Sequence, residues 1–137
     1  MLPAIAVLHP RHRRARESGT ILATITGTSA VIVGLAGSVN ADLQPAALFV
    51  LGMWWWTIGK LWAETAILPR MFGLATAALG ALALAGGLFA SVSIGVSVVR
   101  PDVPDVAVWT IAQVALGAWL TILGGILSRV APDVPSR

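Results

Sequence analysis

Apolar residues gather in four long windows along the chain, and short polar segments separate these windows. Each window has close to the roughly 20 residues that a helix needs to cross the hydrocarbon core of a bilayer. Helices are the expected form, because lipid offers an open backbone no hydrogen-bond partners and the alternating pattern of barrel strands is absent. The predicted spans are residues 20–39, 46–65, 73–92 and 106–127.

The connections between the windows predict how the helices are arranged. Residues 40–45 and 66–72 are short and contain Asn, Asp, Pro and Arg, which suit turns and helix ends. Short turns make successive helices antiparallel neighbours. We therefore predict an all-α integral membrane protein, a four-helix bundle of antiparallel up-down spans within residues 20–127. Residues 1–19 are predicted as a basic cytoplasmic tail, solvated and without fixed structure, and residues 128–137 as a second cytoplasmic tail.

The third window has two possible far ends. Its apolar run continues beyond residue 92 to Val99, which is farther than an upright span requires. Either this helix tilts, or the serine-rich stretch 91–97 leaves the bilayer as a short external segment. Both alternatives remain open at the level of the sequence.

Composition supports a membrane protein and excludes a single soluble core. Of the 137 residues, 57% are hydrophobic and 11% are charged, and the mean hydropathy is +0.86. A soluble domain carries about 25% charged residues to cover its surface. The chain has no cysteine, which rules out a disulfide framework, a thiolate metal site and a cysteine nucleophile.

The positions of the histidines exclude further chemistry within the bundle. His9 and His12 both lie in the basic tail, so no imidazole pair can hold a haem between the spans and no histidine–carboxylate metal cluster is expected. The spans also lack the Asp pair or Ser–His dyad of an intramembrane protease. We therefore expect no cofactor and no enzymatic activity. A lipid-modifying enzyme is a distant alternative, because no nucleophile and base can be paired.

Basic residues predict the orientation. With a cytoplasmic N-terminus, the far side carries Arg100 as its one basic residue, and the positive-inside rule is satisfied. Both termini are then cytoplasmic. The competing interpretation is a signal peptide cleaved after the small-residue pattern Val39-Asn40-Ala41, which would leave three spans. The basic residues on the predicted cytoplasmic side are Arg11, Arg13, Arg14, Arg16, Lys60, Arg70, Arg129 and Arg137.

Small residues recur at helical spacing on three of the windows. Gly73, Gly80 and Gly87 repeat every seven residues in the third window, and Gly117, Thr121 and Gly125 repeat every four in the last. The small residues of the first window are Ala23, Gly27, Ala30, Gly34 and Ser38. Association of helices in lipid depends on small residues that let backbones come close. These faces predict packing within the four-helix bundle, with the seam of a homo-oligomer as the alternative.

Large aromatic side chains concentrate in the second window. Trp54, Trp55 and Trp56 are consecutive and fall near the predicted midplane, whereas tryptophan normally collects at the membrane interface. Three consecutive rings point in three directions, so at least one should meet another helix or a subunit. One hypothesis is an aromatic wall of a ligand or partner site, which would also include Trp62. The other is bulky packing.

Lys60 and Glu64 lie four residues apart on one helix face, with Trp56 one turn before Lys60. Charges within a membrane suggest a function, here a proton or anion relay with cation–π support from Trp56. The alternative is interfacial anchoring with a weak ion pair, because the lysine stem can reach the headgroups. Gln113 in the last window is the candidate interhelical hydrogen-bond donor or ligand contact.

The basic tail predicts a partner of its own. Its arginines carry no interleaved aromatics, so anionic lipid headgroups are expected to bind them and nucleic acid is not. Each basic residue near the surface contributes about 1 kcal/mol to such binding. The arginines concerned are Arg11, Arg13, Arg14 and Arg16.

The turn between the second and third windows reads Leu68-Pro69-Arg70-Met71-Phe72-Gly73. It resembles the Leu-Pro-Arg-x-Phe-Gly turn of uncharacterised bacterial multi-spanning membrane proteins, over about thirty residues. The resemblance implies a bacterial inner-membrane setting and carries no activity.

Together these features predict a small non-enzymatic protein. The leading hypothesis is an accessory or scaffold subunit that packs against a larger membrane protein, with the tryptophan-rich helix as the contact surface. The alternative is a small homo-oligomeric transporter or channel, with Lys60, Glu64 and Gln113 lining its path.

Overall fold

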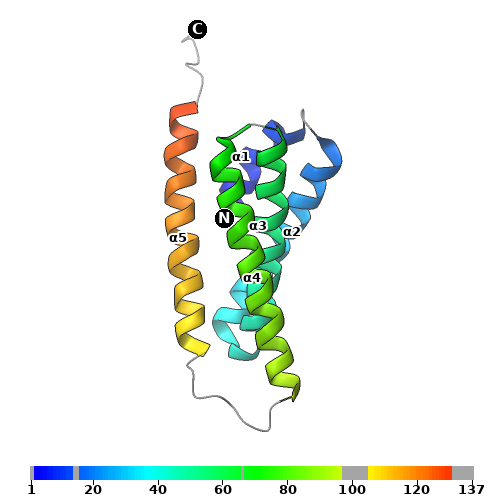
Figure 1. Cartoon of the computed structure of the whole chain (residues 1–137), viewed down its shortest axis with the longest axis vertical. Helices are drawn as coiled ribbons and strands as arrows, with labels where there is room; N and C mark the ends of the chain where they lie inside the picture. The colour runs from blue at the N-terminus through cyan, green and yellow to red at the C-terminus, as the bar shows by residue number, and fades with distance from the viewer. Residues whose placement is uncertain (1, 14–15, 66, 97–104, 131–137) are drawn as a thin grey trace. The chain divides into compact units, whose positions relative to one another are not determined.

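The structure is a computed structural model that describes residues 2–13, 16–65, 67–96 and 105–130. The described chain is helical, and each of the four predicted windows falls inside one helix (Figure 1). The helices form two compact units, Met1–Asp102 and Val103–Arg137, hereafter unit 1 and unit 2. The elements are α1 (Leu2–Arg13), α2 (Glu17–Val39), the 3-10 turn η1 (Ala41–Leu43), α3 (Gln44–Thr65), α4 (Arg70–Val96) and α5 (Asp105–Val130). Unit 2 contains α5 and is described by itself.

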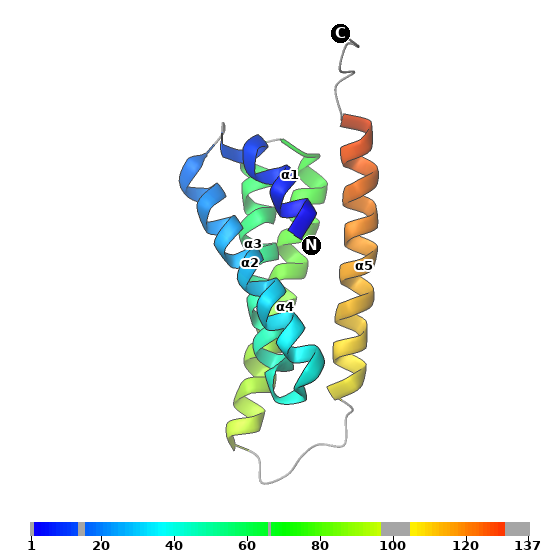
Figure 2. The same cartoon turned by 180° about the vertical axis from the view of Figure 1, so that it is seen from behind.

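Residues 2–13 form helix α1, so the prediction of a tail without fixed structure is wrong for this segment. Ile5 and Leu8, one turn apart, are buried in unit 1, and Ile5 lies close to both Gly27 of α2 and Trp54 of α3. The imidazole Nδ1 of His9 lies 2.8 Å from the hydroxyl of Thr24 in α2. Two buried apolar side chains and this hydrogen bond hold the segment as a helix. Figure 2 shows α1 beside α2.

A tight connection makes α2 and α3 antiparallel. The Asn40 side chain accepts a hydrogen bond from the backbone N–H of Asp42 at 3.0 Å and caps η1. Neighbouring positions then run in opposite directions along the two helices: Gly37 lies against Ala47, and Gly19, near the start of α2, lies against Leu61 near the end of α3. The start of α2 is thereby placed beside the end of α3.

Glycines on both helices bring the backbones of α3 and α4 into contact. We refer to Gly52, Gly59, Gly73, Gly80 and Gly87 as the glycine seam. A Cβ built on any of the five would clash with the backbone of the facing helix, at 2.5 Å from a backbone nitrogen in the case of Gly52. The predicted packing role of the glycines of α4 is therefore confirmed within the chain.

Helix α4 extends past its predicted end at residue 92. It has 27 residues and reaches Val96, so the stretch 93–96 continues the helix. Residues 97–99 lie outside the described residues. Because Gly87 faces Phe49 in antiparallel register, the last turn of α4 extends beyond the first residue of α3.

The outer faces of unit 1 are apolar, whereas its inside is built from small residues and tryptophan. Exposed aliphatic and aromatic side chains follow the length of α2 and α4, which is the distribution expected of surfaces in contact with lipid. On α2 these are Ile21, Leu22, Ile25, Ile32, Leu35 and Val39. On α4 they are Met71, Leu74, Leu82, Leu88 and Phe89.

Three helices are long and apolar enough to cross a membrane, which fits a multi-pass membrane protein. They are Glu17–Val39 in α2, Arg70–Phe89 in α4 and Trp109–Arg129 in α5. Among the described helices, α3 falls below this threshold. Its mean hydropathy is lower because its sequence includes four tryptophans, Lys60 and Glu64. In the structure α3 packs against the apolar helices α2 and α4.

Candidate functional site

The exposed candidate residues gather where α2 begins and α3 ends. Trp56, Lys60 and Glu64 follow one another at intervals of four residues and share one exposed face of α3, as the spacing predicts. Arg16, the N-cap residue of α2, lies beside them. The site is therefore assembled from two helix ends by the antiparallel packing of α2 and α3.

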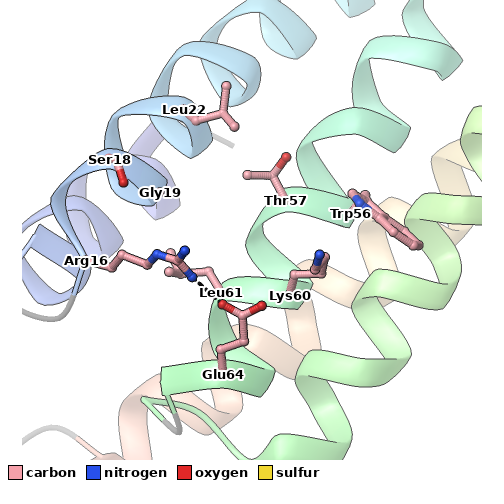
Figure 3. A pocket seen from close by; sticks show the side chains of 9 residues that line it. All are labelled: Arg16, Ser18, Gly19, Leu22, Trp56, Thr57, Lys60, Leu61 and Glu64. Atoms are coloured by element: carbon pink, nitrogen blue, oxygen red, sulfur yellow. Dashed lines mark hydrogen bonds and ion pairs between the residues drawn. The ribbon is translucent and has the colours of Figure 1, made fainter.

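A groove of about 390 Å³ lies between these two helix ends (Figure 3). From α2 it is lined by Arg16, Ser18, Gly19 and Leu22. From α3 it is lined by Trp56, Thr57, Lys60, Leu61 and Glu64. Its volume falls in the roughly 300–1,000 Å³ range of small-molecule sites. The charged residues lie toward one end of the groove, with Leu22 and Trp56 farther along the two helices.

Arg16 and Glu64 form an ion pair across the groove. One Nη of Arg16 donates a hydrogen bond to a carboxylate oxygen of Glu64, and the two atoms lie 2.5 Å apart. The anchoring interpretation included a weak ion pair between Lys60 and Glu64, and that pairing is wrong: the described partner of Glu64 is Arg16. The predicted antiparallel order places the start of the first span near the end of the second, but the sequence does not give the register that brings Arg16 to Glu64.

Lys60 contacts the ring of Trp56 instead. Its Nζ lies 6.0 Å from the ring centroid, which confirms the predicted cation–π contact. Such a contact at an exposed position contributes about 0.5–1 kcal/mol. Among the described residues Lys60 takes part in no ion pair, so its charge is available to a ligand.

Three of the candidate tryptophans lie inside unit 1. The exposed fractions of Trp54, Trp55 and Trp62 are 1%, 2% and 0%, against 43% for Trp56. Trp62 stacks on Phe72 of α4 with ring centroids 5.5 Å apart. The three buried side chains act as packing, and Trp56 is the candidate tryptophan of α3 that a ligand or partner can reach.

The remaining candidates are dispersed. Gln113 lies in α5, in unit 2, so a path shared with Lys60 and Glu64 remains a prediction. Arg13 pairs with Glu17 at 3.6 Å, and Arg14 lies outside the described residues. The side chain of Arg11 is likewise not described. Two tail arginines, Arg13 and Arg16, are thus engaged with carboxylates of the protein itself.

Hydroxyl groups within the helices donate hydrogen bonds to the backbone of their own helix. Thr20, Thr57 and Thr76 donate to carbonyl oxygens one turn earlier at 2.7–2.8 Å. Within the described part of the chain, no cluster of three His, Cys, Asp or Glu residues is placed to hold a metal ion.

Comparison of the chain with protein-family models, curated proteins and solved structures found no match.

Proposed function

We propose that the chain is a four-span protein of a bacterial inner membrane with both termini in the cytoplasm. Helices α2 and α4 are each long and apolar enough to cross a membrane. Because α3 joins them and runs antiparallel to both, it has to return through the same bilayer. Its 22 residues give a length of about 33 Å, enough for the hydrocarbon core. The helix α5 supplies the fourth span, and the bias of basic residues sets the orientation.

Single-cysteine labelling tests this topology, since the natural sequence contains no cysteine. Ser18 at the start of α2 and Asp42 in η1 are both exposed. In intact cells a membrane-impermeant maleimide is expected to label the Asp42→Cys variant and to label Ser18→Cys only after permeabilisation. The cysteine-free parent is the control. Labelling of both variants in intact cells, or the reverse pattern, would refute the orientation.

We further propose that the protein acts without catalysis, as an accessory subunit of a larger membrane protein. The observation that carries this proposal is the closed packing of unit 1. The glycine seam brings α3 and α4 together without space between them, and tryptophans fill the inside. A tightly packed unit with apolar outer faces is better suited to contact another membrane protein than to conduct solutes.

Native mass spectrometry after gentle extraction from the host membrane tests the accessory role. The expected result is a complex with one distinct larger membrane protein at a fixed ratio. The intact mass also shows whether residues 1–41 are retained, as the packing of α2 on Trp54 favours. A homo-oligomer or a lone monomer would overturn the proposal, and ion flux through such an oligomer would establish the transporter alternative.

A further inference from the structure

The groove between α2 and α3 carries an excess of positive charge. Of its three charged residues, Arg16 and Glu64 neutralise each other across a 2.5 Å hydrogen bond. Lys60 remains, with its ammonium group held over the exposed ring of Trp56. The first backbone N–H groups of α2 lie at the same end, and the N-cap residue Arg16 makes no side-chain hydrogen bond to them. The net charge of the groove therefore favours an anion.

The groove is also amphipathic along its length. Arg16, Ser18 and Glu64 lie at the helix ends, whereas Leu22 lies farther along α2, and Trp56 lies farther along α3 (Figure 3). Leu22 belongs to the apolar outer face of α2, so the groove continues directly into a surface suited to lipid tails. A ligand that matches this gradient has an anionic head and an apolar tail.

From this arrangement we propose that the groove binds one anionic phospholipid of the cytoplasmic leaflet. Its phosphate is held by the ammonium group of Lys60 and by the free hydrogen-bond donors of Arg16, with Ser18 within the same groove. One acyl chain lies along Leu22 and Trp56. Glu64 does not repel the phosphate, because its charge is already met by Arg16. The proposal depends on the membrane location of the chain, and not on its accessory role.

Lipid titration of the purified full-length protein in non-ionic detergent, followed by native mass spectrometry, tests the site. The probes are phosphatidylglycerol and phosphatidylcholine with identical acyl chains. Phosphatidylglycerol is expected to bind about tenfold more tightly, and the Lys60→Gln variant to lose about tenfold of that affinity, because it removes a charge-assisted hydrogen bond. The Lys60→Arg variant should retain it.

Arg70→Gln is the matched control. Arg70 is an exposed basic residue at the start of α4 that does not line the groove, so its loss should change the affinity by less than about twofold. Equal losses in Lys60→Gln and Arg70→Gln would show general attraction to charge and overturn the site. Equal affinity for the two lipids would do the same. Effective competition by inorganic phosphate would assign the groove to a soluble anion and refute the lipid.

Discussion

The Gly80→Ala substitution is expected to lower the free energy of unfolding by about 3 kcal/mol, and Gly80→Leu to prevent α3 and α4 from packing. A Cβ on Gly80 would clash with the backbone nitrogen of Trp56 and lie 2.8 Å from its Cα. Backbone atoms cannot move aside as a flexible side chain can, so the two helices must separate. Denaturation by SDS in mixed micelles measures the loss.

Gly34→Ala provides the matched control for the glycine seam. A Cβ on Gly34 of α2 meets none of the described atoms within 4 Å, so the change should alter stability by less than about 1 kcal/mol. If both alanine variants are equally stable, the backbone contact between α3 and α4 does not hold unit 1 together.

The Trp62→Ala substitution is expected to cost about 3–5 kcal/mol of unfolding free energy. Trp62 is 0% exposed and stacks on Phe72, so its removal leaves a cavity between α3 and the start of α4. Lost packing contacts matter most in a membrane protein, because burial in lipid supplies little driving force between helices. The same micelle denaturation assay applies.

Trp56→Ala is the control for this prediction. It deletes the same side-chain volume from an exposed position, and the expected loss is limited to the cation–π contact with Lys60, about 0.5–1 kcal/mol. A loss at Trp56 as large as that at Trp62 would contradict the assignment of Trp62 to the core of unit 1.

Helix positions could be predicted from the sequence because apolar run length is a property of local sequence. The repeat of Gly73, Gly80 and Gly87 also predicted a packing face correctly, since small residues serve that purpose in lipid whichever helix they face. The extension of α4 to Val96 could not be predicted, because a tilted helix and an external segment share the same composition. The helical structure of α1 was not predicted, because it depends on the burial of Ile5 and Leu8 against the other helices of unit 1.

The candidate site was predicted in part. The shared face of Trp56, Lys60 and Glu64 follows from helical periodicity within one element. The partner of Glu64 comes from another helix, and pairing between elements depends on register that local pattern does not contain. The burial of Trp54 likewise depends on α1 and α2, which bring Ile5 and Gly27 to it, and Trp55 lies where Gly80 of α4 approaches.

The hydrogen bond between α1 and α2 joins one donor on His9 to one acceptor on Thr24. The Thr24 hydroxyl donates to the carbonyl oxygen of Thr20 at 2.9 Å, so its oxygen must accept the bond from Nδ1–H of His9. The attachment of α1 therefore depends on the Thr24 hydroxyl oxygen as acceptor, and loss of that oxygen would leave the N–H of His9 without this partner.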